Sequence, residues 1–186
     1  MLKKIQFCCG STKLDGWENY DEETDITKPL PFADNTVDYI YCEHGIEHIT
    51  QKQAWYFLEE CNRILRQGGK IRLSFPDIYQ ITLGNSIEYN LFITGFAQSM
   101  NMPFHKCKDI RETIRTMFLG LNHQSAWTSG LMRSFLEGTG FVYVISCKVG
   151  ESPDRELEKI EQHYKLDFVG LPMYMIETAI LEGTKL

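Results

Sequence analysis

The sequence lacks the features that mark several classes of protein. No continuous apolar stretch of about 18 residues occurs, so no membrane-spanning helix is expected. Residues 1–7 do not form the apolar core of a signal peptide. The 6 cysteines fit neither a small disulfide scaffold nor a C-x-x-C zinc knuckle, which favours reduced, structural thiols. Together these absences predict a cytoplasmic protein that does not associate with membranes.

An excess of basic residues is also absent. The chain carries 19 Lys and Arg against 25 Asp and Glu, a formal net charge of −6. Proteins that bind nucleic acid normally present a basic face, so no nucleic-acid partner is expected. Neither repeats nor linkers are recognisable, and 186 residues with 43% hydrophobic content suit a single domain spanning 1–186.

Apolar residues alternate between strand and helix patterns along the chain. Thr50 and Gln53 form a capping box, which predicts a helix that begins there and stops near Gly68. Thr128 is the expected cap of a second helix that stops near Gly138. Strands are predicted over 4–9, 37–42, 70–75, 141–147 and 174–181, with a short strand near residue 20 and further helical patterns over 110–118 and 154–163.

Alternation of strands and helices predicts an α/β fold with a mostly parallel central sheet. Residues 77–122 interrupt the alternation and carry many aromatic residues, so we expect an inserted helical or loop segment there, a candidate lid that binds the acceptor. The alternative for these aromatics is ordinary core packing. Ligands of such sheets bind beyond the carboxyl ends of the strands, which directs attention to Cys9–Gly10, Glu43–His44 and Pro76–Asp77, and to Asp21 after the short second strand.

The stretch Cys42–His48 reads C-E-H-G-I-E-H and contains the H-x-x-E-H spacing of inverted zinc proteases. Zinc binding through this motif requires both histidines on one helix face. His44 instead follows a predicted strand, and Gly45 is a poor helix former. We therefore predict no metal site here, and keep a zinc hydrolase using His44, Glu47 and His48 as the weakest alternative.

The histidines admit two interpretations each. His44 is either a site residue or part of the scaffold, and His48 is expected to be a buried, hydrogen-bonded side chain. His123 lies before a predicted helix, where it is either a general base for a substrate hydroxyl or a hydrogen-bonding loop residue. His123 and His44 are the candidate catalytic residues.

The stretch D-I-T-K-P-L-P-F-A-D-N-T-V-D-Y-I-Y-C-E-H-G-I-E-H resembles class I S-adenosylmethionine-dependent methyltransferases of the type 11 kind. The segments G-G-K-I-R-L-S-F-P and H-Q-S-A-W-T, and the helix end L-E-G-T-G-F, fit the same family. G-E-S-P-D-R-E-L and P-M-Y-M-I-E-T resemble a compact bacterial subgroup often suspected of acting in surface-glycan pathways. The resemblance implies a Rossmann-like methyltransferase fold with an antiparallel last strand.

The resemblance also implies roles for individual residues. It places Cys8, Cys9 and Gly10 beside the methionine part of S-adenosylmethionine and Asp21 at the ribose hydroxyls. The remaining positions that it implies are Asp25 and Ile26 at the adenine, and Glu43 and His44 facing cofactor and substrate. The expected enzyme transfers a methyl group from S-adenosylmethionine to a small-molecule or glycan-related acceptor and releases S-adenosylhomocysteine. The oligomeric state stays open, with a dimer among the options.

Several positions depart from the family pattern. Gln6 replaces the acid of the first strand, Cys8 replaces a glycine, and Thr12 replaces the third loop glycine. Residues 11–16 are too few for the usual first crossover helix, so either a loop crosses to the second strand or that strand is unpaired. These departures motivate an alternative function, that of a catalytically inactive binding module with the methyltransferase fold.

Overall fold

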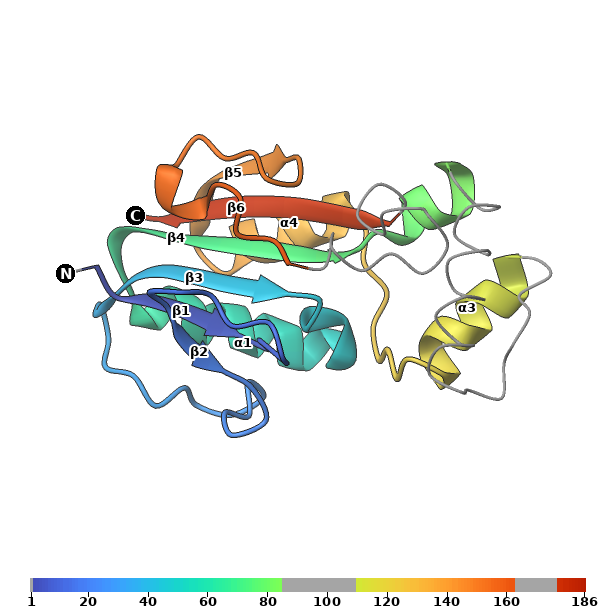
Figure 1. Ribbon diagram of the computed structural model, residues 1–186, viewed down its shortest axis with the longest axis horizontal. Coiled ribbons are helices and arrows are strands. Elements are labelled where there is room, and N and C mark those ends of the chain that lie inside the picture. Colours follow the sequence, from blue (N-terminus) through green and yellow to red (C-terminus); the bar gives the residue numbers. More distant parts are fainter. Residues whose placement is uncertain (1, 85–109, 163–176) are drawn as a thin grey trace.

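The computed structural model describes residues 2–84, 110–162 and 177–186. Their strands form one mixed sheet in the order β2-β1-β3-β4-β6-β5 (Figure 1). β1, β2, β3 and β4 pair in parallel, and β6 pairs antiparallel to both β4 and β5. The predicted α/β class with a mostly parallel sheet and an antiparallel last strand is therefore confirmed. The strands are β1 (Lys4–Phe7), β2 (Glu18–Tyr20), β3 (Val37–Glu43), β4 (Leu65–Pro76), β5 (Phe141–Cys147) and β6 (Thr178–Lys185).

The crossover from β1 to β2 contains no helix. β1 and β2 nevertheless pair in parallel, with Ile5 opposite Glu18 and Phe7 opposite Tyr20. Of the two predicted arrangements, the loop crossing is therefore correct, and the shortened first crossover is confirmed. The connection from β2 to β3 also lacks a helix among the described residues.

Two helices cover one face of the sheet (Figure 1). α1 (Gln51–Ile64) begins at the predicted capping box of Thr50 and Gln53, and α4 (Ser129–Gly138) begins at Thr128, whose side chain accepts from the Leu131 amide. α1 ends four residues earlier than predicted, because β4 starts at Leu65. The apolar side chains of α1 and α4 join those of the strands in the main core, which includes Phe57, Leu58, Ile71, Leu73, Phe75, Met132 and Leu136.

The opposite face of the sheet is covered by loops in place of helices. Tyr41 on β3 packs there against Leu157 and Ile160, with Trp17 of the β1–β2 loop at its edge. Arg72, on the same face of β4, is fully buried and paired with Glu161 and Glu182. The predicted helix over 154–163 is wrong, because only the 3-10 turn η3 (Arg155–Leu157) forms in residues 154–162.

The described parts of segment 77–122 are mostly helical, in agreement with the expected helical or loop segment. They comprise the π-helical turn η2 (Gln80–Gly84) and α3 (Ile110–Leu119), which lie beyond the end of the sheet to which β3 points (Figure 1). The predicted strand over 174–181 is displaced to Thr178–Lys185, and its first residues lie outside the described ranges together with 85–109 and His163. No described helix has the length and apolarity needed to cross a membrane.

Candidate functional site

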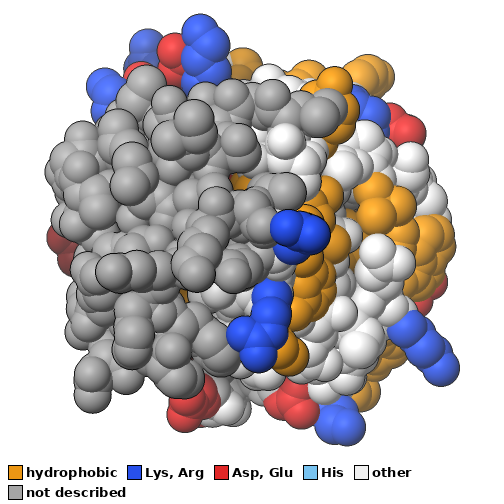
Figure 2. All heavy atoms as spheres, turned by 90° about the vertical axis from the view of Figure 1, so that its right-hand side faces the viewer, with side chains coloured by type: hydrophobic (Ala, Val, Ile, Leu, Met, Phe, Trp, Pro, Cys, Tyr) orange, Lys and Arg blue, Asp and Glu red, His pale blue; other side chains and the backbone are white. Residues whose placement is uncertain are grey.

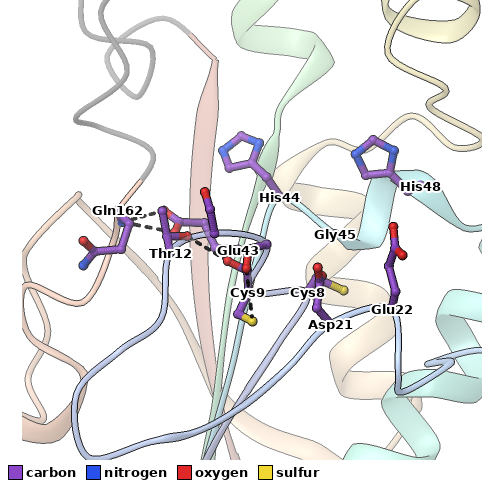
Figure 3. Close-up of a pocket in the computed structure, with 12 residues that line it drawn as sticks. Cys8, Cys9, Thr12, Asp21, Glu22, Glu43, His44, Gly45, His48 and Gln162 are labelled. Atoms are coloured by element: carbon purple, nitrogen blue, oxygen red, sulfur yellow. Dashed lines mark hydrogen bonds between the residues drawn. The ribbon is translucent and has the colours of Figure 1, made fainter.

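The candidate site lies where the three parallel strands β1, β2 and β3 end. Because parallel strands finish at the same edge of a sheet, the segments that follow them converge. They enclose a cavity of about 540 Å³, a volume within the usual range for small-molecule and cofactor sites. The lining consists of residues 8–12, 21–22 and 43–45 together with His48 and Gln162 (Figure 3).

The loop after β1 is fixed at its base by polar contacts. The Thr12 amide and hydroxyl both donate to the Cys9 carbonyl, at 2.9 Å each. Gln6, which is fully buried, donates from Nε2 to the Thr12 carbonyl at 3.0 Å and accepts from the Leu14 amide at 3.1 Å. Gln6 therefore has a structural role that an acid at this position could fill only in part, since a carboxylate cannot donate.

Two residues of this loop have left-handed backbone angles. Gly10 has φ +49°, and a Cβ atom built on it would meet nothing within 4 Å. Cys8 has φ 55°, a conformation in which glycine is favoured over other residues. Cys8 thus occupies a position that a glycine would fill without strain.

Gly45 is required by close packing between the loops. Its own φ is −126°, so the backbone conformation does not demand glycine. A Cβ there would lie 2.5 Å from Cys8 Sγ and 2.6 Å from Cys8 Cβ, and 3.1 Å from Cys42 Sγ. The loop after β1 and the loop after β3 are therefore fitted to each other at this point.

Asp21 follows β2 and lines the cavity, as predicted. Figure 3 shows its side chain at the cavity, beside Cys8 and Cys9. Burial raises the pKa of the Cys9 thiol, and the negative charge of Asp21 adds to the effect. An accessible carboxylate at this place is suited to accept hydrogen bonds from ligand hydroxyls.

Glu43 also lines the cavity, but its carboxylate is hydrogen-bonded to the backbone of a distant segment. Both oxygens accept from the Gln162 amide, at 2.9 and 3.1 Å (Figure 3). This contact joins the end of β3 to the segment that covers the second face of the sheet. Glu43 therefore shapes the cavity wall.

His44 is buried in a network at the rim of the cavity. Its Nε2 lies 3.1 Å from Thr178 Oγ1, and its Nδ1 lies 3.3 Å from Glu47 Oε1. Burial alone would lower the pKa of His44, but the Glu47 carboxylate reverses the effect and raises that pKa to about 9. His44 is thus protonated near neutral pH and is unsuited to act as a general base.

Asp25 and Ile26 are not among the residues that line the cavity. The Asp25 carboxylate accepts from the amide and hydroxyl of Thr27, at 2.9 and 2.6 Å, and Ile26 belongs to the main core. The segment after them is tied to α1, because Glu60 accepts from the Leu30 amide at 2.7 Å. The adenine contacts predicted for Asp25 and Ile26 stay predictions.

His123 does not line the cavity, but it lies against a residue that does. Its ring is 5.0 Å from the ring of His48, at 89°. Glu47, His48 and His123 each offer a ligand atom, and these atoms all lie within 4.8 Å of one another. Burial lowers the pKa of His123 to about 4, so its imidazole is neutral at pH 7 and a weak base.

The sequence interpretation missed this cluster. Glu47 and His48 share the turn η1 (Ile46–His48), while His123 is 75 positions away and reaches them only through the fold. The argument that His44 and His48 share no helix face agrees with the structure, since His44 has φ 48° and lies outside η1. The sequence pattern could not show that His123, from a distant segment, joins Glu47 and His48.

The face of the molecule at which β3 ends is shown in Figure 2. On its described part, hydrophobic and uncharged side chains lie between scattered basic and acidic ones, and no continuous basic surface is visible.

Comparison with known proteins identifies the fold family. Residues 13–73 match the family model described as a methyltransferase domain. This region contains β2, β3, α1 and most of β4, and hence two of the three strand ends that enclose the cavity. No curated protein sequence matches the chain significantly.

Solved structures extend the likeness to almost the whole chain. A SAM-dependent methyltransferase from Thermotoga maritima has a TM-score of 0.57 at 12% identity, covering 99% of this chain and 82% of that one. One from Archaeoglobus fulgidus has a TM-score of 0.57 at 13% identity, covering 99% and 86%. At these identities the likeness shows the fold alone.

A longer enzyme shares the fold over part of its length. Phosphoethanolamine N-methyltransferase 2 from Haemonchus contortus, solved in complex with S-adenosyl-L-methionine, has a TM-score of 0.51 at 12% identity. The match covers 91% of this chain and 37% of that one. Taken with the match over residues 13–73, these findings confirm the Rossmann-like methyltransferase fold expected from the sequence.

Proposed function

The chain has the fold of the class I S-adenosylmethionine-dependent methyltransferases, and on that premise we propose that it binds S-adenosylmethionine in the strand-end cavity. It transfers the methyl group to a small-molecule acceptor. The observation that carries the proposal is the convergence of the segments after β1, β2 and β3 on one cavity of about 540 Å³.

The residues present fit this cofactor. Gly10 presents backbone to open space, so a ligand can approach the loop without meeting a side chain at that position. Asp21 lies at the end of the adjacent strand, where an acid commonly accepts from ribose hydroxyls. The loop of residues 8–12 would lie beside the methionine part, with Asp21 beside the ribose.

S-adenosylmethionine, when bound, supplies an electrophilic methyl group. The protein then has to position the acceptor and exclude water from the reacting atoms. His44 and His123 are poorly suited to remove a proton, since the first has a pKa of about 9 and the second of about 4. Of the described histidines, His44 and His48 line the cavity.

The acceptor is a small molecule, glycan-related if the sequence likeness to the compact bacterial subgroup extends to function. The described parts of segment 77–122, η2 and α3, stand beyond the strand ends, on the side where an acceptor would enter (Figure 1). This placement supports a role for the segment in acceptor binding.

An inactive binding module was the alternative. A filled cleft with Cys8 packed against Asp21 would favour it. Cys8 packs against Gly45, and a cavity of about 540 Å³ is left between the strand ends. This arrangement supports the enzyme over the module.

Calorimetric titration with S-adenosylmethionine and S-adenosylhomocysteine tests the proposal. We expect one ligand per chain, and binding weakened by Asp21→Ala. Asp15→Ala is the matched control, because Asp15 is an exposed acid of the same region outside the cavity lining. Absence of heat at millimolar ligand, or equal affinity of wild type and Asp21→Ala, would overturn the proposal.

A further inference from the structure

We propose that Glu47, His48 and His123 form a divalent cation site in the wall of the strand-end cavity. Their ligand atoms lie within 4.8 Å of one another. Two imidazoles and one carboxylate are the donor set of open metal sites that keep positions free for water or substrate. The candidate cation is therefore Zn²⁺, Mn²⁺ or a related divalent transition metal.

The spacing is close to what a cation requires. Ligand atoms around tetrahedral Zn²⁺, at about 2.0–2.2 Å from the metal, are separated by roughly 3.4 Å. Atoms within 4.8 Å of one another can reach that separation through side-chain rotation. His48 is half-buried and Glu47 and His123 are buried, so the backbone is already in place.

An unsatisfied carboxylate oxygen is the second, independent observation. Glu47 is 2% exposed, and its Oε2 has no hydrogen-bond partner among the described residues. A buried carboxylate oxygen without a partner is costly, and a bound cation is one of its ordinary explanations. The other oxygen, Oε1, is held by His44 Nδ1 at 3.3 Å.

His44 acts on the site through Glu47. Its ring is fixed at the far nitrogen, where Nε2 lies 3.1 Å from Thr178 Oγ1. A ligating carboxylate is typically oriented by such a neighbour, which leaves the second oxygen directed at the metal. His44 is thus a positioning residue.

The segment after His123 is attached to η1 by four hydrogen bonds. The amides of Gln124 and Ser125 donate to the Glu47 carbonyl at 2.8 and 3.2 Å. The side chain of Gln124 donates to the His48 carbonyl at 2.7 Å, and that of Ser125 to the Ile46 carbonyl at 3.3 Å. These contacts hold His123 beside Glu47 and His48 without a metal, as expected of a preorganised site.

The simpler alternative is a hydrogen bond that a histidine donates to Glu47. Such a bond would satisfy Oε2, yet that oxygen is left without a partner among the described groups. The unsatisfied oxygen therefore favours the cation over the hydrogen bond.

The consequence for catalysis rests on the proposed function. His48 also lines the cavity, so a cation bound to it would be reachable from the cofactor side. A cation there would hold an oxygen of the acceptor, such as a hydroxyl or carboxylate. Metal coordination lowers the pKa of a bound hydroxyl, so the cation would favour loss of the acceptor proton.

Metal binding can be measured without any acceptor. Untagged protein, stripped with a chelator, is titrated calorimetrically with Zn²⁺ and with Mn²⁺, and Co²⁺ is used for absorption spectroscopy. We expect one equivalent bound, and a Co²⁺ spectrum without thiolate charge-transfer bands. Cys8→Ser should bind equally well, which separates this site from the nearby thiols.

Variants distinguish the proposed metal ligands from the positioning residue His44. Glu47→Gln and His123→Asn should weaken binding by more than about 100-fold, and His44→Asn by about 10-fold, as for residues around a ligand. Glu59→Gln, an exposed acid of α1, is the control and should leave binding unchanged. Thermal melting without metal verifies that each variant folds, and Glu47→Asp replaces Glu47→Gln if that variant does not fold.

Two results would overturn the inference. One is no binding of Zn²⁺, Mn²⁺ or Co²⁺ at millimolar concentration. The other is stoichiometric binding that persists in both Glu47→Gln and His123→Asn. Titration with S-adenosylhomocysteine is independent of these measurements. If that ligand binds and no metal does, the cation site alone is wrong, and the converse result contradicts the proposed function.

Discussion

The contact between Gly45 and Cys8 gives the sharpest test of how the cavity is built. Gly45→Ala introduces a methyl group 2.5 Å from Cys8 Sγ and 2.6 Å from Cys8 Cβ. Rotation of the Cys8 side chain can move Sγ away, but Cβ is bonded directly to the main chain and moves only with it. The loop after β1 must therefore shift. Overpacking of this kind costs about 1–3 kcal/mol. The φ of −126° adds no penalty for alanine.

Cys8→Gly removes the obstructing side chain. The substitution also removes the backbone strain of a non-glycine residue in the left-handed region, which is worth about 1–2 kcal/mol. The gain is offset by about 0.5–1 kcal/mol of glycine chain entropy and by lost contact of the sulfur with its neighbours. The single variant should therefore change the free energy of unfolding by less than about 1 kcal/mol. In the Cys8→Gly background, Gly45→Ala should become nearly neutral.

The assay is urea unfolding of the four proteins of this double-mutant cycle, followed by far-ultraviolet circular dichroism. We expect a coupling free energy of about 2 kcal/mol between the sites. Gly45→Ala alone should lower the melting temperature by about 4–8 °C. Equal costs of Gly45→Ala in both backgrounds would refute the reasoning, as would no cost in the wild type. Binding of S-adenosylhomocysteine should follow the same pattern, because these loops line the cavity.

Two further predictions concern buried charge. Arg72→Ala leaves Glu161 and Glu182 facing each other without their cation and should cost about 3–5 kcal/mol in urea unfolding; a loss under about 1 kcal/mol would contradict the buried triad. The Arg63 guanidinium lowers the pKa of Glu60, so this carboxylate stabilises the fold above its unfolded pKa and loses the effect as pH falls through its folded pKa. Glu60→Gln should therefore lower the melting temperature at pH 7 and have little effect near pH 3, whereas a loss independent of pH would count against the pair.

The sequence predicted the elements whose signals are local. The capping box of Thr50 and the cap at Thr128 are short-range hydrogen-bond patterns, and both appear where expected. β5 agrees with its prediction at both ends. The mostly parallel sheet was predicted from the alternation of strands and helices, and its antiparallel last strand from the resemblance. The order of the strands was not predicted.

Elements that depend on distant partners were predicted less well. The charged stretch after residue 154 has a helical composition, yet Asp154 pairs with Lys70 at 2.7 Å and Glu161 with Arg72. These tertiary ion pairs attach residues 154–161 to β4, and only the short turn η3 is helical there. A single sequence shows no partner for Arg72, so its alternation with Ile71 and Leu73 suggested only an ordinary strand.

The site was predictable where it follows from strand ends. Cys8, Cys9, Gly10, Asp21, Glu43 and His44 all line the cavity, because each follows or ends a parallel strand. Asp25, Ile26 and His123 do not line it. The contact of His123 with Glu47 and His48 depends on how a distant loop returns to the sheet, and composition cannot reveal that.

Hydrogen exchange measured by mass spectrometry, with and without S-adenosylhomocysteine, tests the central claim most directly. Exchange of backbone amides reports on local opening, so bound ligand slows it where contacts form. We predict protection in residues 8–12, 20–22 and 43–48, the segments that follow β1, β2 and β3. Saturating ligand without protection in these segments, or with protection confined to other parts of the chain, would contradict a cofactor site at the strand ends.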